Sequence, residues 1–143
     1  MGIIIRFLLV TIAGIFVFPL FQSCHEDPES LVGFEIPEGV LINSWTIEDF
    51  TQADSSRADD FQGIVMTFDK SRRLFINKGG TEFETLWSLR ATSLSLSIDV
   101  ADTLLRELSG VYVSLEEIDS LANTLDLTNS NPRTPSTLLL EKL

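Results

Sequence analysis

The two side chains best suited to nucleophilic or metal chemistry stand next to each other, and neither residue type recurs. The 143-residue chain has one cysteine, Cys24, and one histidine, His25. A structural disulfide needs two cysteines, a Cys/His zinc site needs about four ligands, and a Ser-His-Asp triad needs a histidine that the fold can bring to a serine. We therefore expect no catalytic residues, no metal site and no cofactor, and we expect that the chain is not an enzyme.

Carboxylates are the only abundant reactive groups. The chain has 21 Asp and Glu against 10 Lys and Arg, and its net charge is −11. Nucleic acids are excluded as partners, because binding to phosphates depends on Lys and Arg that neutralise them.

Two acidic groups deserve a chemical interpretation. Asp54, Asp59 and Asp60 share one polar stretch that could offer oxygen ligands to calcium. Their spacing matches no calcium-loop pattern, so a solvated loop is the preferred interpretation. A second group has the residue types that glycosidases pair, but such a group has almost no specificity in so acidic a chain: Glu116, Glu117 and Asp119.

Residues 1–23 have the pattern of a signal peptide. Arg6 is their only charged residue, and the fifteen residues from Phe7 to Phe21 contain no ionisable group. This stretch is shorter than the roughly 20 apolar residues that span a bilayer. A tilted membrane anchor that starts at Ile3 is the alternative.

The segment ends in Leu20-Phe21-Gln22-Ser23-Cys24, which resembles the lipoprotein box of bacterial lipoproteins. In that family the chain is cleaved before the cysteine, which becomes an acylated first residue. The resemblance predicts that Cys24 is lipidated and that the membrane is a partner through its acyl chains. Glu26 and Asp27 resemble the surface-export signal of some Gram-negative lipoproteins, or they belong to a solvated linker. The expected location is the outer membrane, on its periplasmic face or at the cell surface.

The chain after Cys24 divides into a tether and one domain. Residues 24–39 are rich in acids, proline and glycine without apolar periodicity, which predicts an acidic flexible tether. From residue 40 to 143 the dominant pattern is alternation of apolar and polar residues, which places successive side chains on opposite faces of a sheet. Eight candidate strands follow from this pattern: 41–47, 64–68, 74–76, 83–89, 94–98, 111–115, 125–128 and 138–140.

Two segments compete as helices. Leu104, Leu105 and Leu108 have helical spacing after a candidate N-cap at Asp102, which predicts a short helix or turn over 102–109. Over 114–125, a helix that begins at Ser114 is the alternative to strands, and the sequence leaves this choice open.

Short antiparallel strands joined by tight turns favour closure, because closure removes the unpaired edges of a sheet. The predicted fold is therefore all-β, an antiparallel up-and-down barrel or half-barrel of about eight strands. Segments 41–47, 61–68, 86–96, 108–113 and 125–128 resemble the small lipocalin-like domain of bacterial lipoproteins. That resemblance implies a non-enzymatic barrel and supplies no catalytic residues.

Four aromatic residues are expected inside the barrel, either as core or as the lining of a ligand pocket: Trp45, Phe68, Phe83 and Trp87. Thr103 and Ser120 lie in Asp-Ser/Thr-apolar sequences, which resemble O-glycosylation sites of some Gram-negative surface proteins.

The sequence thus predicts a lipid-anchored cell-envelope module of lipocalin-like type with a binding role. One alternative is a carrier of a small apolar ligand inside the barrel. The other is an inhibitor or accessory subunit of another envelope protein, which needs an exposed apolar patch or a protruding loop, for example 101–110 or 129–135.

Overall fold

The computed structural model describes residues 31–133 and 135–143. The predicted signal peptide at 1–23, Cys24 and the tether residues up to 30 lie outside the described residues. Within the described part of the chain, no helix is long and apolar enough to cross a membrane.

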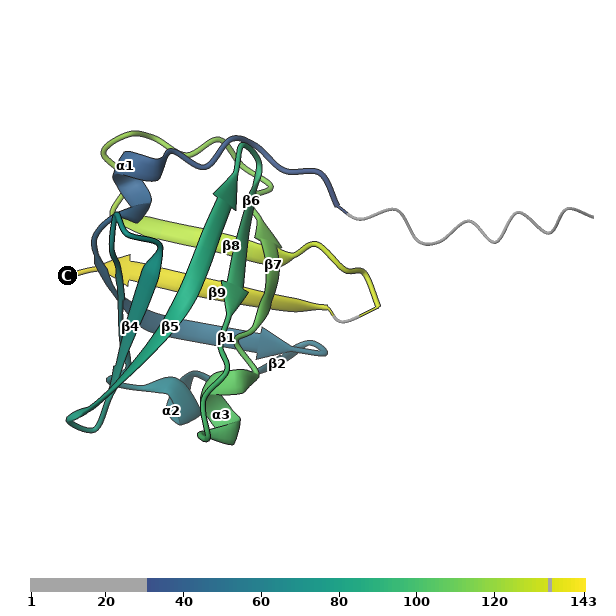
Figure 1. Ribbon diagram of the computed structural model, residues 1–143. Helices are drawn as coiled ribbons and strands as arrows, with labels where there is room; N and C mark the ends of the chain where they lie inside the picture. The colour runs from purple at the N-terminus through teal and green to yellow at the C-terminus, as the bar shows by residue number, and fades with distance from the viewer. Residues whose placement is uncertain (1–30, 134) are drawn as a thin grey trace, which may run out of the picture.

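Eight strands follow one another around a closed antiparallel barrel (Figure 1). Each strand pairs with the next along the chain, and β9 returns to pair with β1. The two-residue strand β2 pairs with the end of β1 as a small hairpin. The prediction of an all-β, eight-stranded up-and-down barrel is confirmed. The strands are β1 (Ser44–Gln52), β2 (Ser55–Ser56), β3 (Val65–Phe68), β4 (Arg73–Lys78), β5 (Thr81–Arg90), β6 (Ser93–Ser97), β7 (Gly110–Val113), β8 (Thr124–Asn129) and β9 (Ser136–Lys142).

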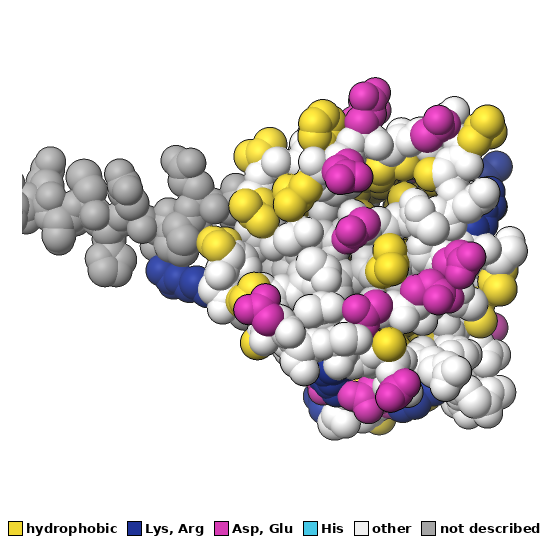
Figure 2. Space-filling model, turned by 180° about the vertical axis from the view of Figure 1, so that it is seen from behind, with side chains coloured by type: hydrophobic (Ala, Val, Ile, Leu, Met, Phe, Trp, Pro, Cys, Tyr) yellow, Lys and Arg dark blue, Asp and Glu magenta, His cyan; other side chains and the backbone are white. Residues whose placement is uncertain are grey.

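The period-two pattern decides which side chains enter the barrel. In β6, Leu94 and Leu96 are buried, while the alternating serines face outward to a greater degree. In β8, Leu125 and Leu127 are buried and Asp126 between them is exposed. Polar residues consequently cover much of the outer surface, where acidic side chains outnumber basic ones on the face seen in Figure 2.

Strand β1 keeps its apolar residues inside by means of an irregularity. Its pairing with β9 shifts between Ile47 and Asp49, so that Glu48 is an extra residue in the ladder. Such a bulge changes the phase of the alternation. Both Ile47 and Phe50 are buried as a result, although they are an odd number of positions apart, three, in the chain.

Three one-turn helices lie at the ends of the barrel: α1 (Glu38–Leu41), α2 (Ala58–Phe61) and α3 (Thr103–Arg106). Helix α3 confirms the short helix predicted over 102–109. The Asp102 carboxylate accepts a hydrogen bond from the Leu105 N–H at 3.1 Å and pairs with Lys78 Nζ at 2.7 Å. These contacts, with Lys78 the larger cause, lower the pKa of Asp102.

The segment left open between helix and strand is irregular over residues 115–123 and enters β8 at Thr124. The Ser114 hydroxyl bonds to the C=O of Glu116 at 2.6 Å and accepts from its N–H at 3.4 Å. A serine that satisfies its neighbour's backbone in this way favours a turn over a regular ladder. We refer to residues 115–123 as the acidic loop.

The prediction of a flexible tether up to residue 39 is wrong for its second half. Residues 31–37, which we call the strap, lie against the barrel through three backbone hydrogen bonds. They join the N–H groups of Leu31, Phe34 and Ile36 to the C=O groups of Ser130, Ser114 and Ala91 at 2.8–3.0 Å. Ile36 is part of the hydrophobic core. The composition of the segment concealed this apolar anchor, because a single isoleucine gives no periodic signal.

Candidate functional site

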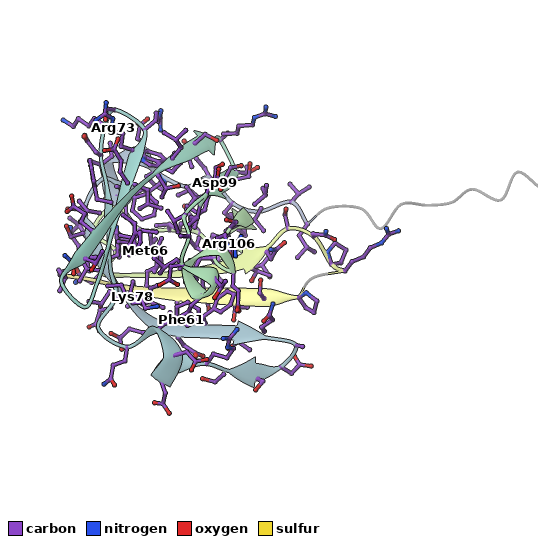
Figure 3. All side chains as sticks on the ribbon, turned by 60° about the horizontal axis from the view of Figure 1, so that its bottom comes forward. Phe61, Met66, Arg73, Lys78, Asp99 and Arg106 are labelled. Carbon is purple, nitrogen blue, oxygen red and sulfur yellow. The ribbon has the colours of Figure 1, made fainter. Side chains whose placement is uncertain are left out.

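The interior of the barrel is filled by its own side chains. Trp45 has an exposed fraction of 0% and Trp87 of 2%, and Phe68 is equally buried. A space wide enough for water beside these rings would leave part of their surface accessible. Phe83 is partly buried and packs against the same core. Figure 3 shows side chains crowded inside the barrel wall, with Met66 among them. Trp45, Phe68 and Trp87 therefore belong to the core, and Phe83 lies at its edge.

Trp87 is held by specific partners as well as by packing. Its indole N–H donates to the C=O groups of Asp69 at 3.1 Å and Arg73 at 3.0 Å. The Phe68 ring lies edge-on, 5.6 Å between centroids. The Arg72 guanidinium lies 4.5 Å from the centroid of the Trp87 ring, in a cation–π arrangement. These contacts fix the ring in one orientation.

Both ends of the barrel are covered. At one end the Trp45 indole N–H donates to the C=O of Leu41 in α1 at 3.0 Å, and Arg72 pairs with Glu38 of the same helix at 3.2 Å. At the other end Phe61 of α2 is buried against Phe50, with 5.1 Å between ring centroids. An eight-stranded barrel can be filled by side chains or can hold one small ligand, and the burial of the rings inside this one favours the filled interior.

Helices α2 and α3 are joined at the second end. Arg57 forms ion pairs with Asp60 and with Glu107, which follows α3. Leu105 and Leu108 are buried. The segment 101–110, one of the two predicted protruding loops, therefore packs against this end of the barrel and covers it.

The predicted acidic groups are solvent-facing. Asp54, Asp59 and Asp60 are exposed, and Asp60 pairs with Arg57 at 2.9 Å. Among the residues with described positions, no group of three or more His, Cys, Asp and Glu has the arrangement of a metal site. Thr103 and Ser120 are exposed, and their O-glycosylation stays a prediction.

Exposed apolar side chains gather on one side of the molecule. Eight large hydrophobic residues are prominently exposed in the described chain, and six of them belong to the strap, β7 or the acidic loop. Backbone hydrogen bonds tie these parts together, since Ser130 bonds to both Leu31 and Val111, and Ser114 bonds to Phe34. Figure 2 shows yellow side chains beside the start of the grey N-terminal trace. The six residues are Leu31, Val32, Phe34, Val111, Leu115 and Leu121.

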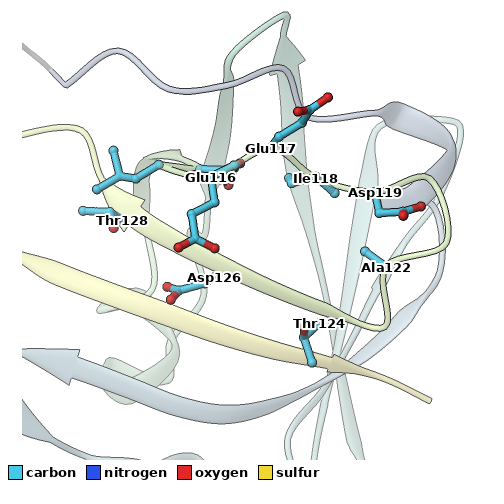
Figure 4. A pocket seen from close by; sticks show the side chains of 10 residues that line it. Glu116, Glu117, Ile118, Asp119, Ala122, Thr124, Asp126 and Thr128 are labelled. Carbon is cyan, nitrogen blue, oxygen red and sulfur yellow. Dashed lines mark hydrogen bonds between the residues drawn. The ribbon is translucent and has the colours of Figure 1, made fainter.

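A groove of about 420 Å³ lies between the acidic loop and the outer face of β8 (Figure 4). The Glu116 and Asp126 carboxylates point toward each other across it. Ile118 and Ala122 contribute apolar surface and also pack against the core. Its lining, as far as described residues form it, contains four carboxylates and no Lys or Arg: Glu116, Glu117, Asp119 and Asp126. We call this space the β8 groove.

Sequence reasoning singled out three of these acids but did not place them beside Asp126. Two of them stand in the run Ser114-Leu115-Glu116-Glu117, which also fits a helix capping box and therefore left the local structure open. In the folded chain the Ser114 hydroxyl holds a turn at the start of the loop, and the groove lies between this loop and β8.

The β8 groove and the exposed apolar surface beside it form the candidate interaction site of this protein. Comparison of the chain with protein-family models, with curated proteins and with solved structures gave no match.

Proposed function

We propose that this chain is a lipid-anchored protein of the bacterial cell envelope that binds another protein on the outside of a filled barrel. The observation that carries the proposal is the contrast between inside and outside. The interior is packed and both ends are covered, while exposed apolar side chains gather around the strap, β7 and the acidic loop. Contiguous exposed apolar surface is typical of protein interaction sites.

The anchor is supported by the lipoprotein box before Cys24. Six residues, 25–30, separate this cysteine from the end of the strap at Leu31. Fully extended, the seven Cα-to-Cα steps from Cys24 to Leu31 span at most roughly 25 Å. An acylated Cys24 would therefore keep the strap and the apolar surface around it close to the outer membrane, either on its periplasmic face or at the cell surface. This arrangement suits a partner that is itself part of the envelope.

Replacement of Cys24 by alanine tests the anchor. We expect the wild-type chain to incorporate labelled palmitate and to fractionate with membranes, whereas Cys24→Ala incorporates none and loses membrane attachment or stays uncleaved, because the thiol is the acylated atom. Ser23→Ala, which keeps a small residue before the cysteine, serves as the matched control and should label normally. Acyl labelling of the Cys24→Ala variant would disprove the anchor.

The filled interior opposes the alternative of a carrier of small apolar ligands. Trp45 and Trp87 report on the interior, because both rings lie in the core. We expect the tryptophan emission spectrum to stay unchanged when palmitate is titrated to a tenfold molar excess below its micellar range. A saturable spectral change that Trp87→Phe reduces would restore the carrier hypothesis.

The remaining alternative, an inhibitor or accessory subunit of an envelope protein, needs the same outer surface. It is a narrower form of the proposed function and not a competing one.

A further inference from the structure

Strand β8 is paired along most of one edge and only at the end of the other. It pairs with β9 at five positions, from Thr124↔Glu141 to Thr128↔Thr137. On its other edge, β7 pairs with it at only two positions, Tyr112↔Asn129 and Val113↔Thr128. The chain then turns away at Ser114 into the acidic loop.

The hydrogen-bond pattern shows which backbone groups this leaves open. The Lys142 N–H donates to the Asn123 C=O at 2.8 Å, in register with the β8–β9 ladder. In an antiparallel pair the bonded residues alternate, so Leu125 and Leu127 also bond to β9. Thr124 and Asp126 therefore direct their N–H and C=O groups toward the other edge.

The β7 side confirms this phase. The N–H of Ser130, which directly follows β8, donates to the Val111 C=O at 2.7 Å. The even-numbered residues of β8 therefore direct their backbone N–H and C=O groups toward β7. Continuing the register would set Asp126 opposite Leu115 and Thr124 opposite Glu117. Among the described residues, neither Thr124 nor Asp126 has a backbone partner on this edge.

The open edge lies in the β8 groove, whose lining includes Thr124, Asp126 and Thr128. An exposed strand edge beside a preformed groove is the geometry used for β-strand addition, in which a partner segment completes the ladder. Two open residues provide two donors and two acceptors, which favours a short extended segment.

Charge selects the chemistry of that segment. Four carboxylates and no Lys or Arg line the groove, and the whole chain has a net charge of −11. The chain's own residues 24–30 contain three acids, and a second copy would bring the same carboxylates against themselves. Both are disfavoured by repulsion, whereas a basic partner is attracted.

On these grounds we propose that the β8 groove binds an extended basic segment of a partner protein, which adds as a strand to the open edge of β8. Side chains of an added strand alternate between the two faces. Apolar residues of the segment would face Ile118 and Ala122, and Lys or Arg residues would face Glu116 and Asp126. This inference deepens the proposed function, and it rests on binding at the outer surface but not on acylation.

The experiment uses amide hydrogen exchange of the full chain in a non-ionic detergent. The probe is an acetylated octapeptide of alternating Lys and Val. Without peptide, we expect the Thr124 and Asp126 amides to exchange at least about tenfold faster than those of Leu125 and Leu127, because only the latter bond to β9. At saturation with the peptide, the Thr124 and Asp126 amides should slow by at least about tenfold.

Two matched peptides separate strand addition from general attraction. An octapeptide of alternating Glu and Val tests charge and should not bind. A Lys-Val peptide that is N-methylated at alternate residues keeps its charge but loses the donors of one edge, and it should give no protection of Thr124 and Asp126. These controls change no residue of the protein.

Matched variants test the location. The double variant Glu116→Gln with Asp126→Asn should lower the affinity for the Lys-Val peptide by about tenfold at low salt, where charge attraction is least screened. The double variant Asp59→Asn with Glu82→Gln removes the same charge from exposed positions outside the groove and should lower this affinity less than twofold. Continued protection of Leu125 and Leu127 verifies that the variants are folded.

Three results would overturn the inference: no binding of the Lys-Val peptide at low salt, binding without protection of Thr124 and Asp126, or protection of these amides in the free chain together with a dimer in light scattering. The last would assign the edge to a second copy. None of them bears on palmitate labelling at Cys24, so failure of this inference is distinguishable from failure of the anchor.

Discussion

The Trp87→Ala variant is expected to lower the free energy of unfolding by about 3–5 kcal/mol, as large-to-small changes of buried aromatic residues do. The ring is 2% exposed, lies against Phe68 and under Arg72, and donates to two backbone carbonyls. Its removal leaves a void, and the Asp69 and Arg73 carbonyls each lose one of their two donors, in a domain whose total stability is of order 5–15 kcal/mol. Denaturant titration followed by circular dichroism measures the loss.

Two further variants divide this effect into its parts. Trp87→Phe keeps most of the apolar volume but loses the indole donor, and we expect a loss of about 1–2 kcal/mol. The neighbouring Leu86 points outward and is 59% exposed, so Leu86→Ala should change stability by no more than about 0.5 kcal/mol. A Trp87→Ala variant within about 1 kcal/mol of wild type would contradict the filled interior and favour a cavity at this ring.

The second large loss of stability is expected from a substitution of Gly33 in the strap. A Cβ at this position would lie 2.5 Å from the Ser114 carbonyl oxygen and 2.6 Å from the Val113 Cβ. Because Val113 ends β7 and Ser114 directly follows it, both neighbours have little freedom to move. Gly33→Ala should therefore lift the strap and lower stability by about 1–3 kcal/mol, the range for overpacking. The amides of Phe34 and Ile36, which bond to Ser114 and Ala91, should exchange faster.

Gly39 offers a matched control for the same substitution. It lies in α1, and a Cβ there would meet nothing within 4 Å. Gly39→Ala should be neutral or stabilise the domain by about 0.5–1 kcal/mol, because alanine loses less conformational freedom in a helix. If Gly33→Ala left the Phe34 and Ile36 amides as protected as in wild type, the strap would not be fixed by this close approach.

The local pattern of the sequence determined the strands and, through them, the barrel. Alternation over 83–98 marks one buried and one exposed face, and that property depends only on each residue and its neighbours two positions away. The helix near Asp102 was predictable for the same reason, since an N-cap and its leucine spacing act within one turn. Closure into eight strands followed from the number of short strands and the disadvantage of open edges.

Three features were decided only by the tertiary structure, because each depends on residues far apart in the chain. Whether Trp45 and Trp87 form a core or a pocket depends on how side chains from all strands share one volume. The strap depends on Ile36 entering that core and on Gly33 passing close to Ser114, and neither contact has a local signature. The open edge of β8 depends on where β7 departs: Ser114 turns the chain aside, and Asp126 loses the partner that continued register would have given it.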